Sequence, residues 1–316
     1  MTTAFIIPGQ GSQAVGMGHA LWTAEPAARQ VFEQVDEALG EALTRLVFEG
    51  PEDRLRLTEN AQPALLATSL AALRVLEARS GRPLEELCAW VAGHSLGEYA
   101  ALAAARSLTV EDAARLVRLR GRAMQAAVPV GEGAMAAILG LELAAVEEVA
   151  AAASATGVCD VANDNAPGQV VVSGARGAVE LAVELARAKG ARRSMLLAVS
   201  APFHCRLLAP AADAVRDALA GIALRPPAVP LVANVTAAPE SAPAALAELL
   251  VRQVTARVRW REVLLTMAER GVDTTVELGA GKVLSGLTKR TLPGVTGSAL
   301  GTPEEIDAYL ATTSAS

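Results

Sequence analysis

The sequence predicts an α/β fold in which a mostly parallel sheet is covered by helices and interrupted by a second, smaller unit. Short apolar runs alternate with helical segments over residues 3–128 and again from residue 199 onward, the pattern of a sheet with helices on its faces. Between these stretches the predicted order changes to β-α-β-β-α-β, which is too compact to belong to the larger sheet. A chain of 316 residues has room for two such units.

The first part of the large unit is expected to begin with a buried strand that ends at Pro8 and Gly9. Leucines recur on one face of a long helix that Gly81 and Pro83 terminate. Thr109, followed by two acidic residues, supplies a capped start for another helix. The expected elements are a strand at 3–7, helices at 26–39 and 62–79, a strand at 87–92, and helices at 98–105 and 110–127.

The inserted unit has the order of a ferredoxin-like domain. Its expected elements are a strand at 134–139, a helix at 143–153, strands at 158–162 and 169–173, a helix at 178–189 and a strand at 193–199. We therefore expect a small domain at 129–198 within a large domain formed by 1–128 and 199–316. The large domain then continues with helices at 210–219, 244–255, 260–270 and 282–291 and strands at 231–234 and 274–278.

Composition excludes several classes of protein. The net charge of −6 and a pI of about 5.3 argue against a nucleic-acid binder. No uninterrupted apolar run reaches the roughly 18 residues of a membrane span, and the first residues lack the basic segment of a signal peptide. Three cysteines at scattered spacing form neither a disulfide framework nor a zinc motif. We expect a cytoplasmic protein with reduced thiols and without a metal.

A serine bracketed by glycines, Gly93-His94-Ser95-Leu96-Gly97, follows an apolar strand and precedes a helix. The pattern alone is weak, because roughly one chain in ten of this length contains it by chance. Its position between strand and helix is the context that exposes a nucleophilic serine. The Leu96 N–H, at the helix N-terminus, is the natural donor to an oxyanion. The alternative, a serine that only caps the helix, is the weaker interpretation.

A serine nucleophile needs a base, and the chain has only three histidines. His94 adjoins the serine and is expected to point away from its hydroxyl, and His19 lies between the first loop and a helix. His204 follows a proline in a loop between the two units, and it is the favoured base. No acid stands at a strand end between serine and histidine, so a backbone or amide carbonyl would orient the imidazole.

Two further motifs point to binding. The loop Pro8–Gln13 formally fits a dinucleotide fingerprint, but no acid ends a second strand as that site requires. Its backbone N–H groups more plausibly serve an oxyanion. Four arginines, 115, 118, 120 and 122, cluster on one predicted helix. Most would be solvated, and one turned inward would bind a substrate carboxylate. Spacing does not choose which.

Taken together, these segments resemble the malonyl-CoA:acyl carrier protein transacylases of fatty acid synthesis. The matching segments are PGQGSQ at 8–13, QPAL at 62–65, GHSLGEY at 93–99, RGRAMQ at 120–125, GAMAAILGL at 133–141, NAPGQVVVSG at 165–174, SAPFHC at 200–205 and GAGKVLSGLTKR at 279–290. The resemblance covers nearly the whole chain and implies a hydrolase-like large domain with a ferredoxin-like small domain.

The resemblance also implies a role for individual residues. Ser95 would be the acylated nucleophile and His204 its base. Backbone N–H groups of Gln10 and Leu96 would form the oxyanion hole, and Arg120 would hold the malonyl carboxylate. The main-chain carbonyl of a further residue, Gln253, would orient the histidine.

Two departures from the family pattern stand beside that site. The family's Pro-Val-x-Trp is replaced by Arg257-Val258-Arg259-Trp260, which puts the local backbone in doubt. Phe203 stands where many relatives have serine, and its ring should disfavour α-branched acyl groups by overpacking.

The implied activity is that of an acyl-carrier-protein S-malonyltransferase, which moves malonyl from malonyl-CoA to the phosphopantetheine thiol of acyl carrier protein by a ping-pong mechanism. It implies no cofactor, and we expect a monomer. The carrier's acidic helix would meet basic residues, for which the candidates are Arg187, Lys189, Arg192, Arg193, Lys282, Lys289 and Arg290. The alternatives are transfer to a polyketide or malonate decarboxylase carrier, a serine thioesterase or esterase, and a non-enzymatic docking module.

Overall fold

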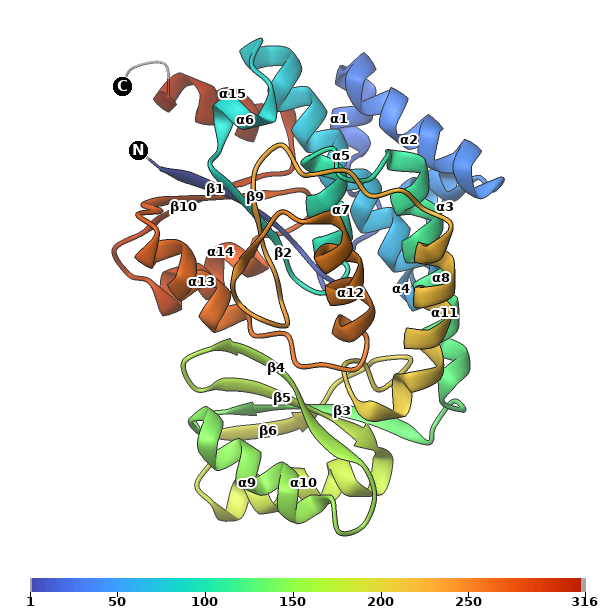
Figure 1. Ribbon diagram of the computed structural model, residues 1–316, viewed down its shortest axis with the longest axis vertical. Coiled ribbons are helices and arrows are strands. Elements are labelled where there is room, and N and C mark those ends of the chain that lie inside the picture. The colour runs from blue at the N-terminus through green and yellow to red at the C-terminus, as the bar shows by residue number, and fades with distance from the viewer. Residues whose placement is uncertain (1, 314–316) are drawn as a thin grey trace.

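The computed structural model describes residues 2–313, and a six-stranded sheet lies at the centre of this part of the chain (Figure 1). Its strands, in spatial order, are β10 (Thr296–Leu300), β9 (Thr274–Leu278), β1 (Thr3–Ile7), β2 (Trp90–Gly93), β7 (Leu231–Val232) and β8 (Pro239–Glu240). Only β8 runs antiparallel to its neighbour. Ile7 pairs with Gly93, so the carboxyl ends of β1 and β2 lie side by side. The loops that follow these two strands are therefore adjacent.

Helices cover both faces of this sheet, because successive residues of each strand face opposite sides. Phe5 and Ile7 of β1 join one core, and Ala4 and Ile6 join the other. The first core is closed by α1 (His19–Ala24), α2 (Pro26–Leu39), α3 (Leu43–Glu49), α4 (Glu52–Arg56), α5 (Thr58–Ser80), α6 (Leu84–Leu87), α7 (Gly97–Ala104), α8 (Val110–Ala127), α11 (Ala209–Ala220), α12 (Pro243–Gln253) and α15 (Pro303–Thr313). The second is closed by α13 (Trp260–Glu269) and α14 (Val283–Thr291).

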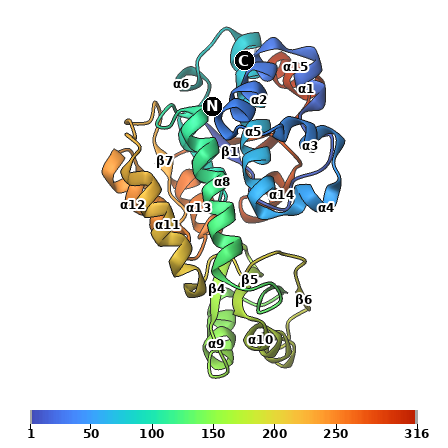
Figure 2. The same cartoon turned by 90° about the vertical axis from the view of Figure 1, so that its right-hand side faces the viewer.

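A second, four-stranded sheet lies at one end of the molecule (Figures 1 and 2). Its strands are β3 (Gly133–Leu139), β4 (Cys159–Ala166), β5 (Gln169–Ala175) and β6 (Arg193–Leu196), in the antiparallel order β4-β5-β3-β6. Helices α9 (Leu143–Ala153) and α10 (Arg176–Ala188) pack on one face. This is the ferredoxin-like arrangement expected from the sequence. From the other face, Met135 and Val171 reach the core of the large sheet.

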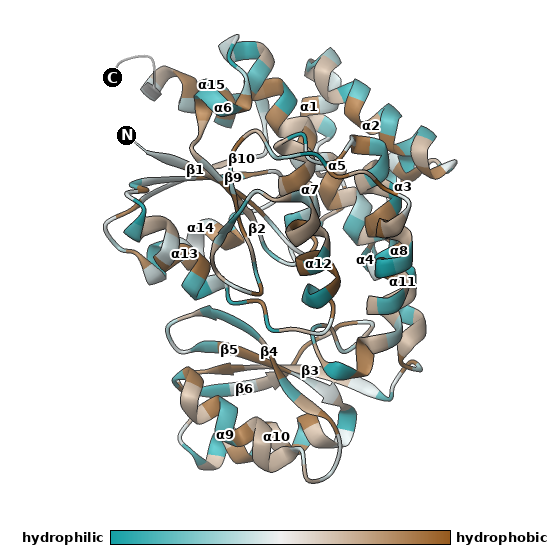
Figure 3. Ribbon diagram, in the orientation of Figure 1, coloured by the Kyte–Doolittle hydropathy of each residue, from teal (hydrophilic) through white to brown (hydrophobic). Residues whose placement is uncertain are grey.

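The polar and apolar residues are distributed as this layering requires. Figure 3 shows hydrophilic and hydrophobic turns alternating on the peripheral helices, as expected for helices with one buried face. Helix α5 is the exception, since it is buried over most of its length between α2, α7 and α8. No helix within residues 2–313 is both long and apolar enough to cross a bilayer.

Several expected boundaries were wrong. Leu87 was expected to begin a strand, but it ends the short helix α6, and β2 starts at Trp90. The strand expected at 231–234 stops at Val232, because the Asn234 N–H donates to the Glu98 carboxylate rather than to a neighbouring strand. Elements that the sequence analysis did not anticipate are α1, α3, α4, α6, the 3-10 helix Arg206–Leu208, β8, β10 and α15. They are short or peripheral, so their hydrophobic periodicity is weak.

Helices α5 and α8 approach each other closely at Gly121, and this contact generates a stability prediction. A Cβ on Gly121 would lie 2.6 Å from Glu59 Cα, whereas one on Gly286 in α14 would meet nothing within 4 Å. Gly121→Ala should lower the free energy of unfolding by about 1–3 kcal/mol through overpacking. Gly286→Ala, the matched control, should raise it by roughly 0.4–1 kcal/mol. Urea denaturation measures both, and equal effects would contradict the close packing.

Candidate active site

Ser95 lies at a sharp turn between β2 and α7 that only glycines permit at its two ends. Its φ angle is 54°, in the left-handed region that non-glycine residues rarely adopt. A Cβ on Gly93 would lie 1.9 Å from the Gly97 carbonyl carbon, and one on Gly97 would lie 2.3 Å from Ile7 O. The side chain of Asn234 accepts a 2.8 Å hydrogen bond from the Ser95 N–H. The close packing at Gly93 and Gly97 and the hydrogen bond to Asn234 therefore hold Ser95 in this strained conformation.

His204 meets Ser95 at hydrogen-bonding distance. The serine Oγ lies 2.7 Å from His204 Nε2, and His204 Nδ1 lies 2.9 Å from the main-chain carbonyl of Gln253. Because a carbonyl can only accept, the proton is on Nδ1 and Nε2 is free to accept from the serine. Burial, reinforced by the nearby charge of Arg120, lowers the pKa of His204 to about 3. The imidazole is therefore neutral near pH 7, as a general base must be.

The other two histidines face elsewhere. His94 Nε2 lies 2.8 Å from Asn165 Oδ1, and its ring lies 5.5 Å from that of Trp260. His19, which is exposed, stacks on Trp22 and meets the Phe48 ring edge-on. All three histidines are within the described residues, and only His204 reaches the serine hydroxyl.

The two residues expected to form an oxyanion hole, Gln10 and Leu96, lie in the loops that follow β1 and β2. The side chain of Gln10 accepts a 2.8 Å hydrogen bond from the Thr58 hydroxyl, which ties its loop to the start of α5. Leu96 lies at the N-terminus of α7, where N–H groups have no helical partner. Within residues 2–313 neither the Gln10 nor the Leu96 N–H donates to a protein acceptor.

Arg120 is the member of the arginine cluster that reaches Ser95. Its Nη2 lies 3.1 Å from Ser95 Oγ and 2.9 Å from Gln253 Oε1, and its Nη1 lies 2.7 Å from Gln62 Oε1. Arg118 is also buried, but it pairs with Glu41 at 2.8 Å. The other two side chains, at positions 115 and 122, are exposed. The buried Arg120 Nε has no hydrogen-bond partner among the described residues.

These groups line a cavity of about 320 Å³ between the two sheets. One wall comes from the large sheet's loops and the other from the small sheet and the segment before His204. The lining residues include Gln10, Gln62, Ser95, Leu96, Arg120, Met135, Asn163, Val171, Leu197, Phe203 and His204. Within residues 2–313 no group of three or more His, Cys, Asp or Glu side chains is placed to hold a metal ion.

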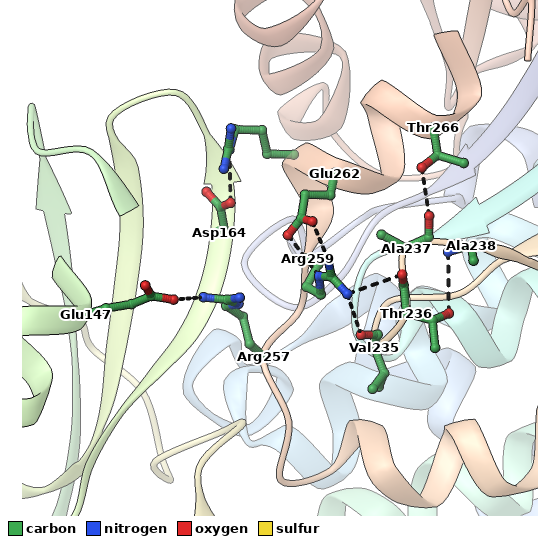
Figure 4. A network of polar contacts seen from close by, with 11 residues as sticks. Glu147, Asp164, Val235, Thr236, Ala237, Ala238, Arg257, Arg259, Glu262 and Thr266 are labelled. Carbon is green, nitrogen blue, oxygen red and sulfur yellow. Dashed lines mark hydrogen bonds and ion pairs between the residues drawn. The ribbon is translucent and has the colours of Figure 1, made fainter. Parts of the chain in front are cut away.

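The segment after Gln253 joins the two sheets at the point where the sequence departs from the pattern of the family that it resembles. Val258 N–H donates to Ala162 O at 2.8 Å, and Asp164 N–H donates back to Val258 O at 2.9 Å. Figure 4 shows Arg257 reaching Glu147 of α9, at 2.6 Å, and Arg259 pairing with Glu262. Arginine at 257 therefore makes an ion pair to the small sheet's helix layer, a contact that the proline of the family pattern lacks.

The sequence analysis missed three buried polar residues that support the site. Gln62 and Asn234 contact Arg120 and Ser95 as described above. Glu98, 1% exposed, accepts from Asn234 N–H and from the Gln253 side chain. Burial raises the pKa of Glu98 to about 7 despite these hydrogen bonds. The signal for Glu98 in the sequence is an acid three residues after the serine, a position that by itself predicts only part of a helix.

Comparison with known proteins places this geometry in a family. A family model for the acyl transferase domain matches residues 4–301. A malonyl CoA-acyl carrier protein transacylase of Bacillus subtilis (strain 168) is 44% identical over 310 residues, which are 98% of this chain and 96% of that protein. One of Escherichia coli (strain K12) is also 44% identical, over 97% of this chain and 98% of its own length.

Solved structures agree with this placement. The acyl-carrier-protein-S-malonyltransferase of Bartonella henselae is 52% identical, with a TM-score of 0.96 and 99% of each chain covered. A malonyl-transacylase in complex with a type II PKS acyl-carrier protein is 41% identical, with a TM-score of 0.95 over 99% of this chain and 100% of that chain. The chain therefore belongs to the acyl transferase family.

The raised pKa of Glu98 generates a prediction about stability and pH. Its folded-state pKa, about 7, exceeds the ordinary value of 4.5, so the stability it contributes is present below pH 4.5 and is lost as the pH rises through 7. The variant Glu98→Gln has no ionisable group at this position, so it does not lose this stability as the pH rises. Its free energy of unfolding should rise relative to the parent by up to about 3 kcal/mol between pH 4.5 and pH 8.

Urea denaturation at pH 4.5, 6 and 8 measures this difference. Glu180→Gln, which removes an exposed carboxylate on α10, is the reference for losing a surface charge. A difference between Glu98→Gln and the parent that stays constant over this range would contradict the raised pKa.

Proposed function

We propose that this protein transfers malonyl from malonyl-CoA to the phosphopantetheine thiol of an acyl carrier protein, through a malonyl ester on Ser95. One observation carries the proposal: the Ser95 hydroxyl lies 2.7 Å from a neutral histidine and 3.1 Å from a buried arginine. A nucleophile, its base and a carboxylate-binding cation thus converge on one point. The relatives are named for the same transfer, and we propose that the transfer supplies fatty acid synthesis.

In the acylation half-reaction, His204 Nε2 takes the proton from Ser95 Oγ as that oxygen attacks the thioester carbonyl. The N–H groups of Gln10 and Leu96 stabilise the oxyanion of the tetrahedral intermediate. When the carbon–sulfur bond breaks, the proton passes from Nε2 to the leaving sulfur and coenzyme A departs. The proton on Nδ1 stays there and donates to the Gln253 carbonyl throughout, so this carbonyl supplies the orientation that a carboxylate supplies in a Ser-His-Asp triad.

The second half-reaction runs the same steps with a different thiol. His204 Nε2 takes the proton of the phosphopantetheine thiol, and the sulfur attacks the malonyl-serine carbonyl. The same two N–H groups hold the second oxyanion. Collapse of this intermediate breaks the bond to Ser95 Oγ, which regains its proton from Nε2. Because each half-reaction ends with a neutral histidine and a free hydroxyl or ester, no cofactor is required.

Arg120 and Phe203 would set the choice of acyl group. Arg120 is fully buried, and its Nε has no hydrogen-bond partner among residues 2–313, so a malonyl carboxylate would complete its hydrogen bonds. An acetyl group would leave the cation without that partner. The ring of Phe203 lines the cavity and would crowd a methyl branch next to the carbonyl. This arrangement favours malonyl over both acetyl and methylmalonyl.

We propose that residues 129–198 act as a small domain that covers the acyl-serine, with 1–128 and 199–316 as the catalytic domain. The protein would work as a cytoplasmic monomer and meet its carrier through a local basic patch, because its net charge is negative. Of the candidate contacts, Lys189 and Lys282 pair with acids of this chain at 2.5 and 2.9 Å. Arg187 and Arg290 donate to Ser194 O and to the Gln169 side chain, respectively. Arg192, Arg193 and Lys289 form neither an ion pair nor a side-chain hydrogen bond within residues 2–313 and are the better candidates.

Ser95→Ala tests the covalent intermediate. Mixing the parent protein with malonyl-CoA should give one malonyl adduct by intact-protein mass spectrometry, which holo carrier protein then removes. The Ser95→Ala variant should give none. Cys205→Ala is the matched control, since burial raises the pKa of this neighbouring thiol to about 11 and makes it a poor nucleophile. Rapid coenzyme A release without an adduct would instead favour a thioesterase.

Arg120→Ala tests the carboxylate site. Losing a buried charge pair with malonyl should lower kcat/KM for malonyl-CoA by at least about 100-fold, since such pairs are worth about 3 kcal/mol or more. Acetyl-CoA should be affected far less, so the preference for malonyl should vanish. Arg115→Ala, an exposed arginine of the same helix, should leave selectivity intact. Unchanged selectivity in Arg120→Ala would remove the carboxylate role from this residue.

A further inference from the structure

A buried carboxylate that the proposed mechanism does not use lies one residue beyond the turn Gly93–Gly97 that carries Ser95. Glu98, in the first turn of α7, is 1% exposed and is not among the residues that line the cavity. Its Oε1 accepts from the Asn234 N–H at 3.1 Å, and its Oε2 accepts from the Gln253 side-chain amide. A buried carboxylate normally costs stability, and here burial raises its pKa to about 7. A carboxylate that is buried despite this cost in stability is expected to have a role in the site.

The side chain of Gln253 lies between this carboxylate and the buried arginine. Its Oε1 accepts from Arg120 Nη2 at 2.9 Å, while its Nε2 donates to Glu98 and also to Ser95 O at 2.9 Å. The two charges fix which end of the amide faces which way, because the cation can only donate and the carboxylate can only accept. The amide cannot flip without losing both contacts.

Fixing this side chain also fixes the backbone that holds the base. Gln253 is the last residue of α12, where carbonyl groups have no helical partner. Its own carbonyl accepts the Nδ1 proton of His204 at 2.9 Å. The side chain and the carbonyl share one Cα, so a displaced amide displaces the acceptor of the imidazole. The path from Glu98 to His204 therefore runs through a single residue.

We propose that Glu98 is a positioning residue for acyl transfer: through the side-chain amide of Gln253 it fixes the carbonyl that orients His204, and it balances the charge of Arg120. This inference rests on the proposed roles of Ser95, His204 and Gln253. A glutamine at position 98 could not replace the glutamate, because both carboxylate oxygens accept, and an amide would turn its NH₂ group toward one of the two donors.

The test is the variant Glu98→Gln, assayed at pH 8, where the parent carboxylate is ionised. The first readout is the rate at which a fluorophosphonate labels Ser95, since this reaction needs His204 but no carboxylate on the substrate. Labelling should slow by roughly 10- to 100-fold, because a misplacement of about 1 Å at a reacting group can cost about 100-fold. The second is single-turnover acylation by malonyl-CoA, where the saturating rate should fall similarly. The half-saturating concentration should change less than about threefold, as Arg120 remains in place.

A double-mutant cycle distinguishes positioning from general loss of structure. Gln253→Ala keeps the main-chain carbonyl but removes the side chain, and it should slow labelling to a similar degree. Adding Glu98→Gln to it should have little further effect, because both changes break the same link. Glu277→Gln is the matched control: this buried carboxylate accepts from Leu284 and Ser285 N–H groups away from the site. It should change stability and leave labelling unchanged.

Several outcomes would overturn the inference. One is a folded Glu98→Gln variant in which Ser95 is labelled at the parent rate. Another is a double variant in which the fold-changes of the two single variants simply multiply. If the Glu98→Gln variant does not fold, the labelling rate of Gln253→Ala is the test. An unchanged rate in that variant would show that the Gln253 side chain does not position His204. If Ser95 is not the residue that becomes acylated, the Ser95→Ala variant will still be labelled or malonylated. That result would reject the proposed function, so the two failures are distinguishable.

Discussion

The close contact between the start of α7 and the end of β1 is the constraint on which the site depends. Gly97 packs so tightly on the Ile7 carbonyl that no side chain fits there, and Gly93 is equally restricted by the Gly97 backbone. With both ends held, Ser95 must take its left-handed conformation, which lifts the hydroxyl out of the sheet. The same contact brings the loop of Gln10 beside Leu96, because β1 and β2 are paired in register.

Around this turn the protein buries several ionisable groups, and their arrangement explains how a histidine works without an acid partner. The imidazole is neutral because burial and Arg120 both oppose its protonation. The Gln253 carbonyl then needs only to accept one hydrogen bond, from Nδ1 of His204, and a carbonyl does so without adding a charge to the site. A carboxylate in its place would lie close to the arginine and compete with the substrate's own carboxylate. The negative charge is instead on Glu98, and the side-chain amide of Gln253 lies between it and Arg120.

The small sheet contributes to the site through its face rather than through catalytic groups. Met135 and Val171 on that face line the cavity, while its helices pack on the opposite side. The segment after Gln253 bonds to β4 in both directions, and Arg257 adds an ion pair to α9. The residue that orients the histidine is thus next to the junction of the two sheets.

The sequence by itself determined the α/β class, the ferredoxin-like insertion and the elbow, because hydrophobic periodicity and glycine spacing are local properties. It also identified His204 as the favoured base from a choice of three. Spacing alone did not choose among Arg115, Arg118, Arg120 and Arg122, and only the family resemblance pointed to Arg120. The tertiary structure decided that both Arg118 and Arg120 are buried and that Arg120 is the one that reaches Ser95. Glu98, Gln62 and Asn234 escaped prediction for the same reason: their partners lie 155, 58 and 139 residues away. Long-range hydrogen bonds leave no pattern in a single sequence, and only the packed chain reveals which buried polar groups meet.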